Sequence, residues 1–328
     1  MYMGKYIVKR LLMMIPVLLG ISFVVFSLLE MSPGSPAQII LGLRATPESI
    51  AELEKELGLD SPFLVRYATY VMDVVKGEWG NSYRTGLPVF EEIFARVPST
   101  LILAFGAMIM MVVISIPIGI LSAVKQYSLM DNATLAGALL LSSMPGFWLG
   151  TILILLFAIN LGWFPAKGGG SLAGYVLPCF ALAASSMATL VRLTRSNMLE
   201  VVRADYIKMA RAKGASEKRV IIVHALRNAC LPIITIVGMN FAKLLGGTMI
   251  IESVFAVSGL GTLAVTAVTQ LDIPLVMGEV LFISTVIGLM NLLVDILYVY
   301  IDPRLKSQYI SVKKKKKLKS IAKEAVEV

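Results

Sequence analysis

Charged side chains are scarce in this sequence of 328 residues. Asp, Glu, Lys and Arg make up 16% of it, hydrophobic residues make up 57%, and the mean hydropathy is +0.80. Soluble domains contain about 25% charged and roughly 45–50% apolar residues. The polar surface is therefore too small to cover a core in water, which excludes a soluble globular protein. A disordered chain is excluded as well, because disorder requires low hydrophobicity.

Residues that carry most catalytic and metal chemistry are equally rare. The single histidine, His224, cannot form a histidine cluster around a metal. Cys179 and Cys230 lie in apolar surroundings, which are typical of small buried side chains. The sequence contains no H-E-x-x-H, G-x-S-x-G or G-x-x-x-x-G-K-[ST] motif. We therefore predict a chain that binds no metal or cofactor, is not an enzyme and does not hydrolyse ATP by itself.

Long apolar runs are what the sequence contains instead. A helix needs about 20 mainly apolar residues to cross the roughly 30 Å hydrocarbon layer of a membrane. Because every backbone amide in lipid must find its partner within the segment, such runs predict spanning helices. Six runs satisfy this test, at residues 11–29, 100–124, 133–161, 172–191, 231–251 and 276–300. The first is longer than a signal-peptide core, so we expect it to remain as an uncleaved anchor. The predicted fold class is an all-α polytopic membrane protein with six transmembrane helices.

The distribution of Lys and Arg predicts the orientation of these helices, because cations in short loops stay on the cytoplasmic side. One side carries three before the first run, one at Lys125, nine in 192–230 and nine after Tyr300. The other side carries six in 31–98 and one at Lys167. Both termini are therefore predicted to be cytoplasmic. We interpret the basic tail as an extension attracted to anionic lipid rather than as a nucleic-acid site.

The predicted organisation has a long external segment after the first helix. Within it, Thr46 and Pro47 open a short helix, and an amphipathic run follows at 63–75. We expect that run at the membrane surface, with Trp79 and Tyr83 as interfacial anchors. The segment either caps the external mouth of the protein or contacts an external partner. The regions are residues 1–30 (amino terminus and first helix), 31–98 (external segment), 99–302 (core of five helices) and 303–328 (basic tail).

The cytoplasmic loop 196–228 lies between the fourth and fifth predicted helices. Residues 198–213 have helical spacing, and Gly214 suits the left-handed conformation that closes a helix. Ser216 is placed to cap a second helix that we expect to end at Asn228, before Pro232. Small residues at the break, bordered by basic ones, would fit a groove on another protein. The alternative is an interfacial hairpin on lipid headgroups.

The residues of this loop match a known pattern. The loop reads Asp205-Tyr206-Ile207-Lys208-Met209-Ala210-Arg211-Ala212-Lys213-Gly214-Ala215-Ser216, then His224-Ala225-Leu226-Arg227-Asn228-Ala229-Cys230-Leu231-Pro232. Further matching stretches are Glu56-Leu57-Gly58-Leu59-Asp60, Gly80-Asn81-Ser82-Tyr83-Arg84-Thr85-Gly86, Leu161-Gly162-Trp163-Phe164-Pro165-Ala166, Gly259-Leu260-Gly261, Asn291-Leu292-Leu293-Val294-Asp295 and Asp302-Pro303-Arg304. In this order and spacing they resemble ABC importer permeases, most closely the B-type membrane subunit of the oligopeptide, dipeptide and nickel group. The likeness covers nearly the whole chain.

The resemblance implies a non-catalytic subunit that forms half of an import path for small peptides, or for nickel or another small solute. Its implied partners are a second related permease, two ATP-binding-cassette ATPases that use the ATP, and an external substrate-binding protein. The implied location is the plasma (inner) membrane of a bacterium or archaeon. By residue, the implied ATPase-docking element is Tyr206, Ala210, Arg211, Ala212, Lys213, Gly214, Ala215 and Ser216.

Three features depart from the family pattern. Lys208 and Met209 stand where the broader loop pattern has a glutamate and an alanine, so a glutamate-dependent contact is not carried over. Ser258 stands where the peptide and nickel branch often has proline, and Ser35 where an aspartate is common.

Polar and helix-breaking residues inside the predicted spans are candidates for the solute path or its gate. They are Met144, Pro145, Trp148, Lys243, Asn291 and Asp295. For the group at 144–148 the alternative is a packed kink, and for Asn291 and Asp295 it is a contact that joins helices near the cytoplasmic boundary. Lys243 either faces the path or is ion-paired. A rival function is an ion-coupled carrier, with Lys243, Glu279 and Asp295 as its coupling charges.

Overall fold

The computed structural model of the chain describes residues 2–32, 34–42 and 45–301. Within these residues the regular elements are helices, and the only β-pairing is an isolated bridge between Asn81 and Pro88. The predicted basic tail 303–328 lies outside the described residues. The all-α prediction is thus confirmed for the described part of the chain.

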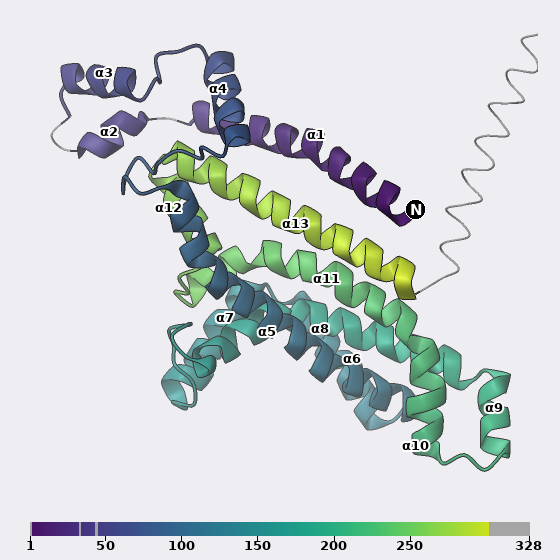
Figure 1. The fold of residues 1–328 in the computed structure, drawn as a ribbon. Coiled ribbons are helices and arrows are strands. Elements are labelled where there is room, and N and C mark those ends of the chain that lie inside the picture. Colours follow the sequence, from purple (N-terminus) through teal and green to yellow (C-terminus); the bar gives the residue numbers. More distant parts are fainter. Residues whose placement is uncertain (1, 33, 43–44, 302–328) are drawn as a thin grey trace, which may run out of the picture.

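Long apolar helices form the body of the molecule (Figure 1). In the part of the chain that the structure describes, five helices are long and apolar enough to cross a membrane, and the number is six if a bent helix pair is counted as one span. The central contacts join α5 to α8 and α8 to α11, whereas α1 packs at the edge of the bundle against α13. These elements are α1 (Tyr2–Glu30), α5 (Val89–Val124), α6 (Leu129–Ser143), α7 (Gly146–Leu153), the π-helix η2 (Ile154–Asn160), α8 (Leu172–Val202), α11 (Arg227–Val254) and α13 (Ile273–Ile301).

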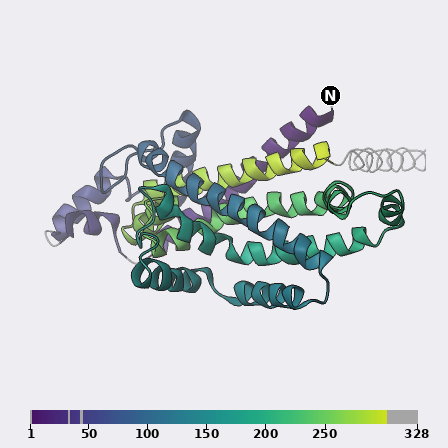
Figure 2. The ribbon, with the colours of Figure 1, turned by 90° about the horizontal axis from the view of Figure 1, so that it is seen from below.

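The ends of the bundle differ, as the predicted orientation requires. The amino terminus, the end of α13 and the loop after α8 lie at one end, and α2–α4 lie at the other (Figures 1 and 2). The start of α1, the end of α13 and a basic loop on one side agree with the predicted arrangement of a cytoplasmic and an external face.

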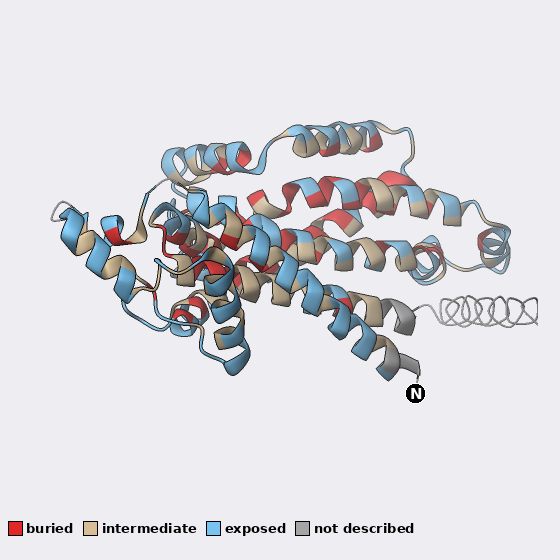
Figure 3. Cartoon of the chain, turned by 90° about the horizontal axis from the view of Figure 1, so that it is seen from above, coloured by how far each residue is buried: buried red, intermediate tan, exposed pale blue. Residues whose placement is uncertain are grey.

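Small residues allow the central helices to approach closely. Buried alanines, among them Ala183, Ala184 and Ala188, run along α8 between α5 and α11. In α5, a Cβ added at Gly119 would come within 2.9 Å of the Val191 carbonyl oxygen of α8, so this position requires glycine. Packing between small residues is the usual way in which helices associate in lipid. Figure 3 accordingly shows the buried residues gathered on the central helices, with α1 mostly exposed.

The third predicted span is not one kinked helix. It breaks into α6 and α7, which meet at 108°. Met144 is extended (φ −84°, ψ 127°), because the proline ring after it disfavours the helical conformation, and Pro145 has no N–H for the helix to use. The break therefore separates two helices that run in different directions, and it is not a kink in one continuous helix.

Three other predicted boundaries were wrong. α5 begins at Val89, eleven residues before the expected start, and it incorporates Pro98. The helix expected to end at Asn228 instead continues through Pro232 into the fifth span, with a π-helical stretch at Val220–Leu226. The fourth span extends to Val202 and so takes up the first part of the predicted 198–213 helix. In each case the apolar run marks only the lipid-spanning part of a longer helix.

The external segment forms α2 (Pro36–Leu41), α3 (Pro47–Glu56) and α4 (Phe63–Lys76). Thr46 opens α3 with a capping box, as the sequence predicts. α4 lies on the outer end of α1, where Phe63 and Tyr67 pack against Phe23 and the Tyr67 hydroxyl lies 2.9 Å from that of Ser22. These contacts hold α4 against α1 at the edge of the bundle, and the role of the external segment stays a prediction. Trp79 packs against Phe90, and burial raises the pKa of Tyr83 to about 12.

A short external helix, α12 (Leu260–Thr269), was not predicted, and it is held by a buried polar network. Thr100 of α5 donates a hydrogen bond to Glu252 of α11 (2.7 Å) and accepts one from the backbone N–H of Leu260 (2.8 Å). Glu252 also accepts a hydrogen bond from the backbone N–H of Thr262 (3.1 Å). The network joins α5, α11 and the start of α12.

Gly261 allows α12 to lie directly on α11. A Cβ at this position would come within 2.2 Å of the Met249 Cα, which is backbone and cannot move aside. We expect Gly261→Ala to lower stability by about 1–3 kcal/mol, the usual cost of overpacking. Thermal unfolding of the purified protein in detergent measures this change. Gly246→Ala in α11 is the matched control, because its Cβ meets nothing within 4 Å and alanine favours a helix. Equal melting temperatures for the two variants would contradict the prediction.

Candidate functional site

The candidate site is a short helix and a turn that project from one end of the bundle. α9 (Asp205–Ala212) follows α8 after a two-residue break, and α10 (Glu217–Arg219) follows the turn and leads through the π-helix η3 (Val220–Leu226) into α11. Figure 1 shows α9 at the end of the molecule, beside α10. The predicted single helix over 198–213 is wrong, because Ala204 is extended (φ −67°, ψ 147°) and separates α9 from α8.

One buried side chain attaches α9 to the bundle. Ile207 is fully buried and packs in a cluster with Met198 of α8 and with Val220 and Ala225 of η3. The break at Ala204 is what turns Ile207 back toward these residues. The cluster thus joins α9 to the end of α8 and, through η3, to the start of α11.

The turn after α9 has the predicted conformation. Gly214 has φ +80°, in the left-handed region, and its N–H donates to the Arg211 carbonyl (2.9 Å). The Ala215 N–H donates to the Ala210 carbonyl (3.2 Å), which closes the helix end. Nothing lies within 4 Å of a Cβ built on Gly214, so the turn faces open space.

The entry to α10 differs from the prediction. Ser216 does occupy the N-cap position, but its side chain makes no capping hydrogen bond. Instead the Arg211 guanidinium donates to both oxygens of Glu217, at 2.7 and 3.3 Å, and ties the two sides of the turn together. These bonds raise the pKa of Arg211, so it stays charged. The sequence signal for this pair was an acid and an arginine on either side of a glycine turn.

The outer surface of this element is polar and basic with two large apolar side chains. Tyr206 is 48% and Met209 60% exposed. Five of the remaining predicted docking residues are exposed: Arg211, Ala212, Lys213, Gly214 and Ser216. Ala210 and Ala215 are half-buried and pack against the cluster around Ile207. An apolar centre with a charged rim is typical of a protein–protein contact. The structure therefore brings the predicted docking residues together on one surface.

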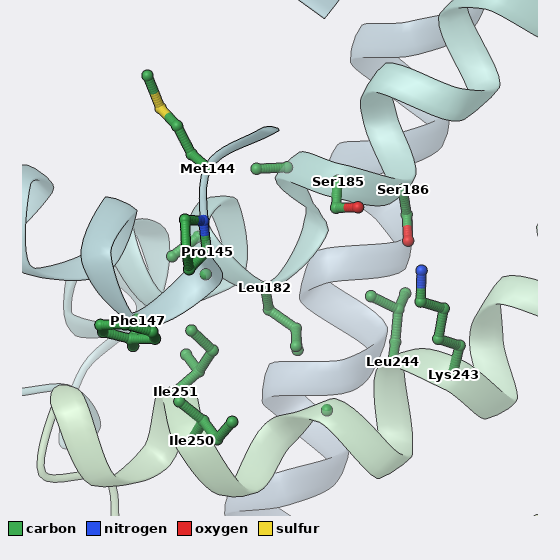
Figure 4. Close-up of a pocket in the computed structure, with 14 residues that line it drawn as sticks. Met144, Pro145, Phe147, Leu182, Ser185, Ser186, Lys243, Leu244, Ile250 and Ile251 are labelled. Atoms are coloured by element: carbon green, nitrogen blue, oxygen red, sulfur yellow. The ribbon is translucent and has the colours of Figure 1, made fainter. Parts of the chain in front are cut away.

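The structure brings together only some of the residues that were predicted to line the solute path or its gate. Met144, Pro145 and Lys243 line one cavity of about 400 Å³ between the α6–α7 break, α8 and α11 (Figure 4). Trp148 is 45% exposed and does not line it. Asn291 is exposed on α13, away from the cavity lining.

Asp295 contacts the first helix. It lies 2.5 Å from the Arg10 guanidinium and accepts a hydrogen bond from the Tyr6 hydroxyl (3.1 Å). These contacts support the interpretation that Asp295 joins helices near one end of the bundle. The i, i+4, i+7 spacing of Asn291, Asp295 and Tyr298 predicts that they share one face of the helix, but the side chain of Tyr298 lies outside the described residues.

Removing the Asp295 carboxylate should weaken the attachment of α1. We expect Asp295→Ala to lower stability by about 1 kcal/mol, because both partners are partly exposed and solvent screens the pair. A double-mutant cycle with Arg10→Ala, read by thermal unfolding, isolates the interaction. Exposed Asp73→Ala, which removes an i,i+3 pair with Lys76, is the control for a surface pair. A coupling energy of zero would contradict the joining role.

A buried ion pair near the same end was missed in the sequence. The Arg195 guanidinium of α8 donates to both carboxylate oxygens of Asp131 in α6, at 2.6 and 2.8 Å. Asp131 is 1% exposed and also accepts hydrogen bonds from the Ser122 hydroxyl and the Tyr127 N–H. Its position at the start of the apolar run was a weak signal. The pair fixes α6 against α8 just before α8 leads into the docking element.

Comparison with known proteins gives a consistent result. Residues 115–307 match the family described as binding-protein-dependent transport system inner membrane component, and residues 3–104 match its amino-terminal family. The dipeptide transport system permease protein DppB of Alkalihalophilus pseudofirmus is 40% identical over 332 residues, which cover 93% of this chain and 100% of that protein. The oligopeptide transport system permease protein AppB of Bacillus subtilis is 40% identical, with 92% of this chain and 99% of that protein covered. The glutathione transport system permease protein GsiC of Salmonella choleraesuis is 40% identical, with 93% and 99% covered.

Solved structures show the same fold. The MetNI methionine ABC transporter, in inward-facing conformations, aligns with a TM-score of 0.53 at 20% identity over 66% of this chain and 98% of that chain. An amino acid ABC transporter aligns with a TM-score of 0.50 at 19% identity over 66% and 94%. The aligned family regions include the docking element and the cavity. The chain belongs to the family of binding-protein-dependent transport system inner membrane components, and it is a multi-pass permease subunit of an ABC transporter.

Proposed function

We propose that this permease carries small peptides into the cell and that separate ATPase subunits drive it through α9 and the Gly214 turn. The observation that carries the proposal is the exposed docking element, which Ile207 links rigidly to α8 and α11. Names of the relatives, which mention dipeptides, oligopeptides and glutathione, support peptides over nickel as the solute.

The proposed assembly contains a second related permease, two ATPases and an external substrate-binding protein in the plasma membrane of a bacterium or archaeon. This chain binds no cofactor, and the partner ATPases bind and hydrolyse the ATP. When the ATPases approach one another, they move the docking element as a rigid body. The two permeases then exchange outward-facing and inward-facing states, a shift in population that is set by the contacts of each state.

The arrangement of charges does not favour the rival, an ion-coupled carrier. Glu279 and Asp295 are 16 residues apart on α13, a rise of about 24 Å at about 1.5 Å per residue. Asp295 is already paired with Arg10, and Lys243 lies on a different helix at the cavity. The three charges do not form one ion site.

Uptake of a radiolabelled dipeptide by cells that express the complete transporter tests the proposal. We expect uptake to survive ionophores that collapse ion gradients and to stop when ATP is depleted. The opposite response would favour the ion-coupled carrier. In the same cells, uptake of radioactive nickel instead of dipeptide would show that the solute was assigned wrongly.

A further inference from the structure

The cavity beside the α6–α7 break contains one charge. Most of its wall is apolar, with Met144, Leu182, Ile250 and Ile251 among the residues that form it. Ser185 and Ser186 also line it, and no acidic residue of the part of the chain that the structure describes does so. Lys243 of α11 extends its side chain into this space toward α8, with Ser185 and Ser186 opposite its ammonium group (Figure 4). An ammonium group in the middle of a spanning helix is costly unless it faces a partner or a wet cavity.

The described part of the chain provides no such partner for Lys243. Among residues 2–32, 34–42 and 45–301 it forms neither an ion pair nor a hydrogen bond. Arg195 of α8 differs from Lys243 in this respect, because it is paired with Asp131 of α6. Ser186 is 2% exposed, and its hydroxyl donates to Asn240 (2.9 Å). The charge of Lys243 is thus left available to a group that enters the cavity.

We propose that Lys243 forms a carboxylate-binding site in the solute path, one that takes the free carboxyl terminus of a peptide as it passes. This inference rests on the proposed function. A carboxylate is the complement of an unpaired ammonium group, and a hydrogen bond between two charged groups is stronger than one between neutral groups. The start of α7 forms part of the same wall, and the positive end of a helix adds to the attraction for an anion.

The rest of the cavity fits the variable part of a peptide. Its volume of about 400 Å³ is within the usual range of small-ligand pockets. Met144 and the aliphatic wall can adjust to different side chains, because methionine is flexible and polarizable. The lining has no acid for the amino terminus. The site therefore recognises the carboxylate that all unmodified peptides share and tolerates what differs among them.

Photolabelling tests this site on the complete transporter in lipid nanodiscs without nucleotide. The probes are alanyl-p-benzoylphenylalanine and its carboxyl-terminal amide, and labelled peptides of this chain are located by mass spectrometry. We expect the carboxylate probe to label segments 144–147 and 243–251 at least about tenfold more than the amide, the ratio that a difference of about 1.4 kcal/mol produces. Equal labelling of the wild-type chain by both probes would overturn the proposal, and this result requires no variant.

Variants then assign the preference to Lys243. Lys243→Met should reduce labelling by the carboxylate probe to the level of the amide, and Lys243→Arg should preserve the preference. Leu182→Ala, which changes the wall but not the charge, should affect both probes equally. A Lys243→Met complex that keeps the preference would also overturn the site. ATP-dependent dipeptide uptake in the same preparation separates the two proposals: if it is absent in the wild type, the proposed function fails, whereas uptake with equal labelling rejects only the carboxylate site.

Discussion

Replacing Gly214 with tryptophan should leave the chain folded in the membrane but separate ATP hydrolysis from uptake. Gly214 lies at the tip of the turn after α9, and open space surrounds its Cα. An indole would therefore not clash within the chain, but it would obstruct a protein that docks on the turn. Interface positions of this kind cost roughly 2–4 kcal/mol when disrupted. We expect dipeptide uptake to fall at least about tenfold, measured in cells against the amount of inserted protein.

The experiment must separate the effect of backbone strain at Gly214 from the effect of obstructing the docking surface. A non-glycine residue in the left-handed conformation costs roughly 1–2 kcal/mol wherever it occurs. Gly77 at the end of α4 has φ +91° and also has nothing within 4 Å, but it lies at the opposite end of the molecule. Gly77→Trp is therefore the matched control, and we expect it to keep ATP hydrolysis coupled to uptake.

The outcome of this comparison decides whether α9 is a docking element. If Gly214→Trp transports at the wild-type rate, the ATPase does not contact this turn. If Gly77→Trp uncouples the transporter to the same degree, the effect comes from backbone strain. An intact rate of ATP hydrolysis with uptake lost only in Gly214→Trp is the expected pattern.

The sequence predicted the lipid-spanning parts of the fold because lipid imposes a simple requirement on them. Each of α1, α5, α8, α11 and α13 contains an apolar run at the expected place. Their ends were not predictable from that requirement, since a helix can continue into water. α5 starts at Val89 with Glu91 and Glu92 in its first turn, where acids stabilise the positive end of a helix.

Whether each proline would lie inside a helix or end it could not be predicted from the sequence. Pro98, Pro117, Pro178 and Pro232 lie inside long helices, whereas Pro145 ends one. A proline costs the helix one hydrogen bond in every case, and whether the helix then bends or breaks depends on what packs around it. The 108° break at Met144–Pro145 therefore depends on tertiary packing, and it forms one wall of the cavity.

The docking element was predicted more completely than the cavity. Gly214 and its small neighbours are contiguous in sequence, so spacing alone places them on one turn. In contrast, the cavity combines residues from α7, α8 and α11, and the Asp131–Arg195 pair joins positions 64 residues apart. A single sequence contains no information about which distant residues meet, and for that reason the ion pair was missed.

Breaking the Asp131–Arg195 pair should have the largest effect on stability. Arg195→Met would leave the carboxylate of Asp131, which is 1% exposed, without its counter-charge. Removing one partner of a buried ion pair costs about 3–5 kcal/mol. We expect a corresponding loss in thermal unfolding in detergent, followed by a fluorescent thiol probe that reacts with buried Cys179 as the helices separate.

Two further variants show whether the loss of stability comes from the unpaired carboxylate of Asp131 or from the missing side chain of Arg195. Arg203→Met removes an arginine whose contact with Gln126 (2.9 Å) is exposed, so we expect a change within about 0.5 kcal/mol. Arg195→Met combined with Asp131→Leu leaves no buried charge, and replacing both partners by apolar residues is often neutral. The double variant should therefore recover most of the stability lost in Arg195→Met. If it is instead less stable than Arg195→Met, the Ser122 and Tyr127 hydrogen bonds to Asp131 hold α6 in place more strongly than the ion pair does.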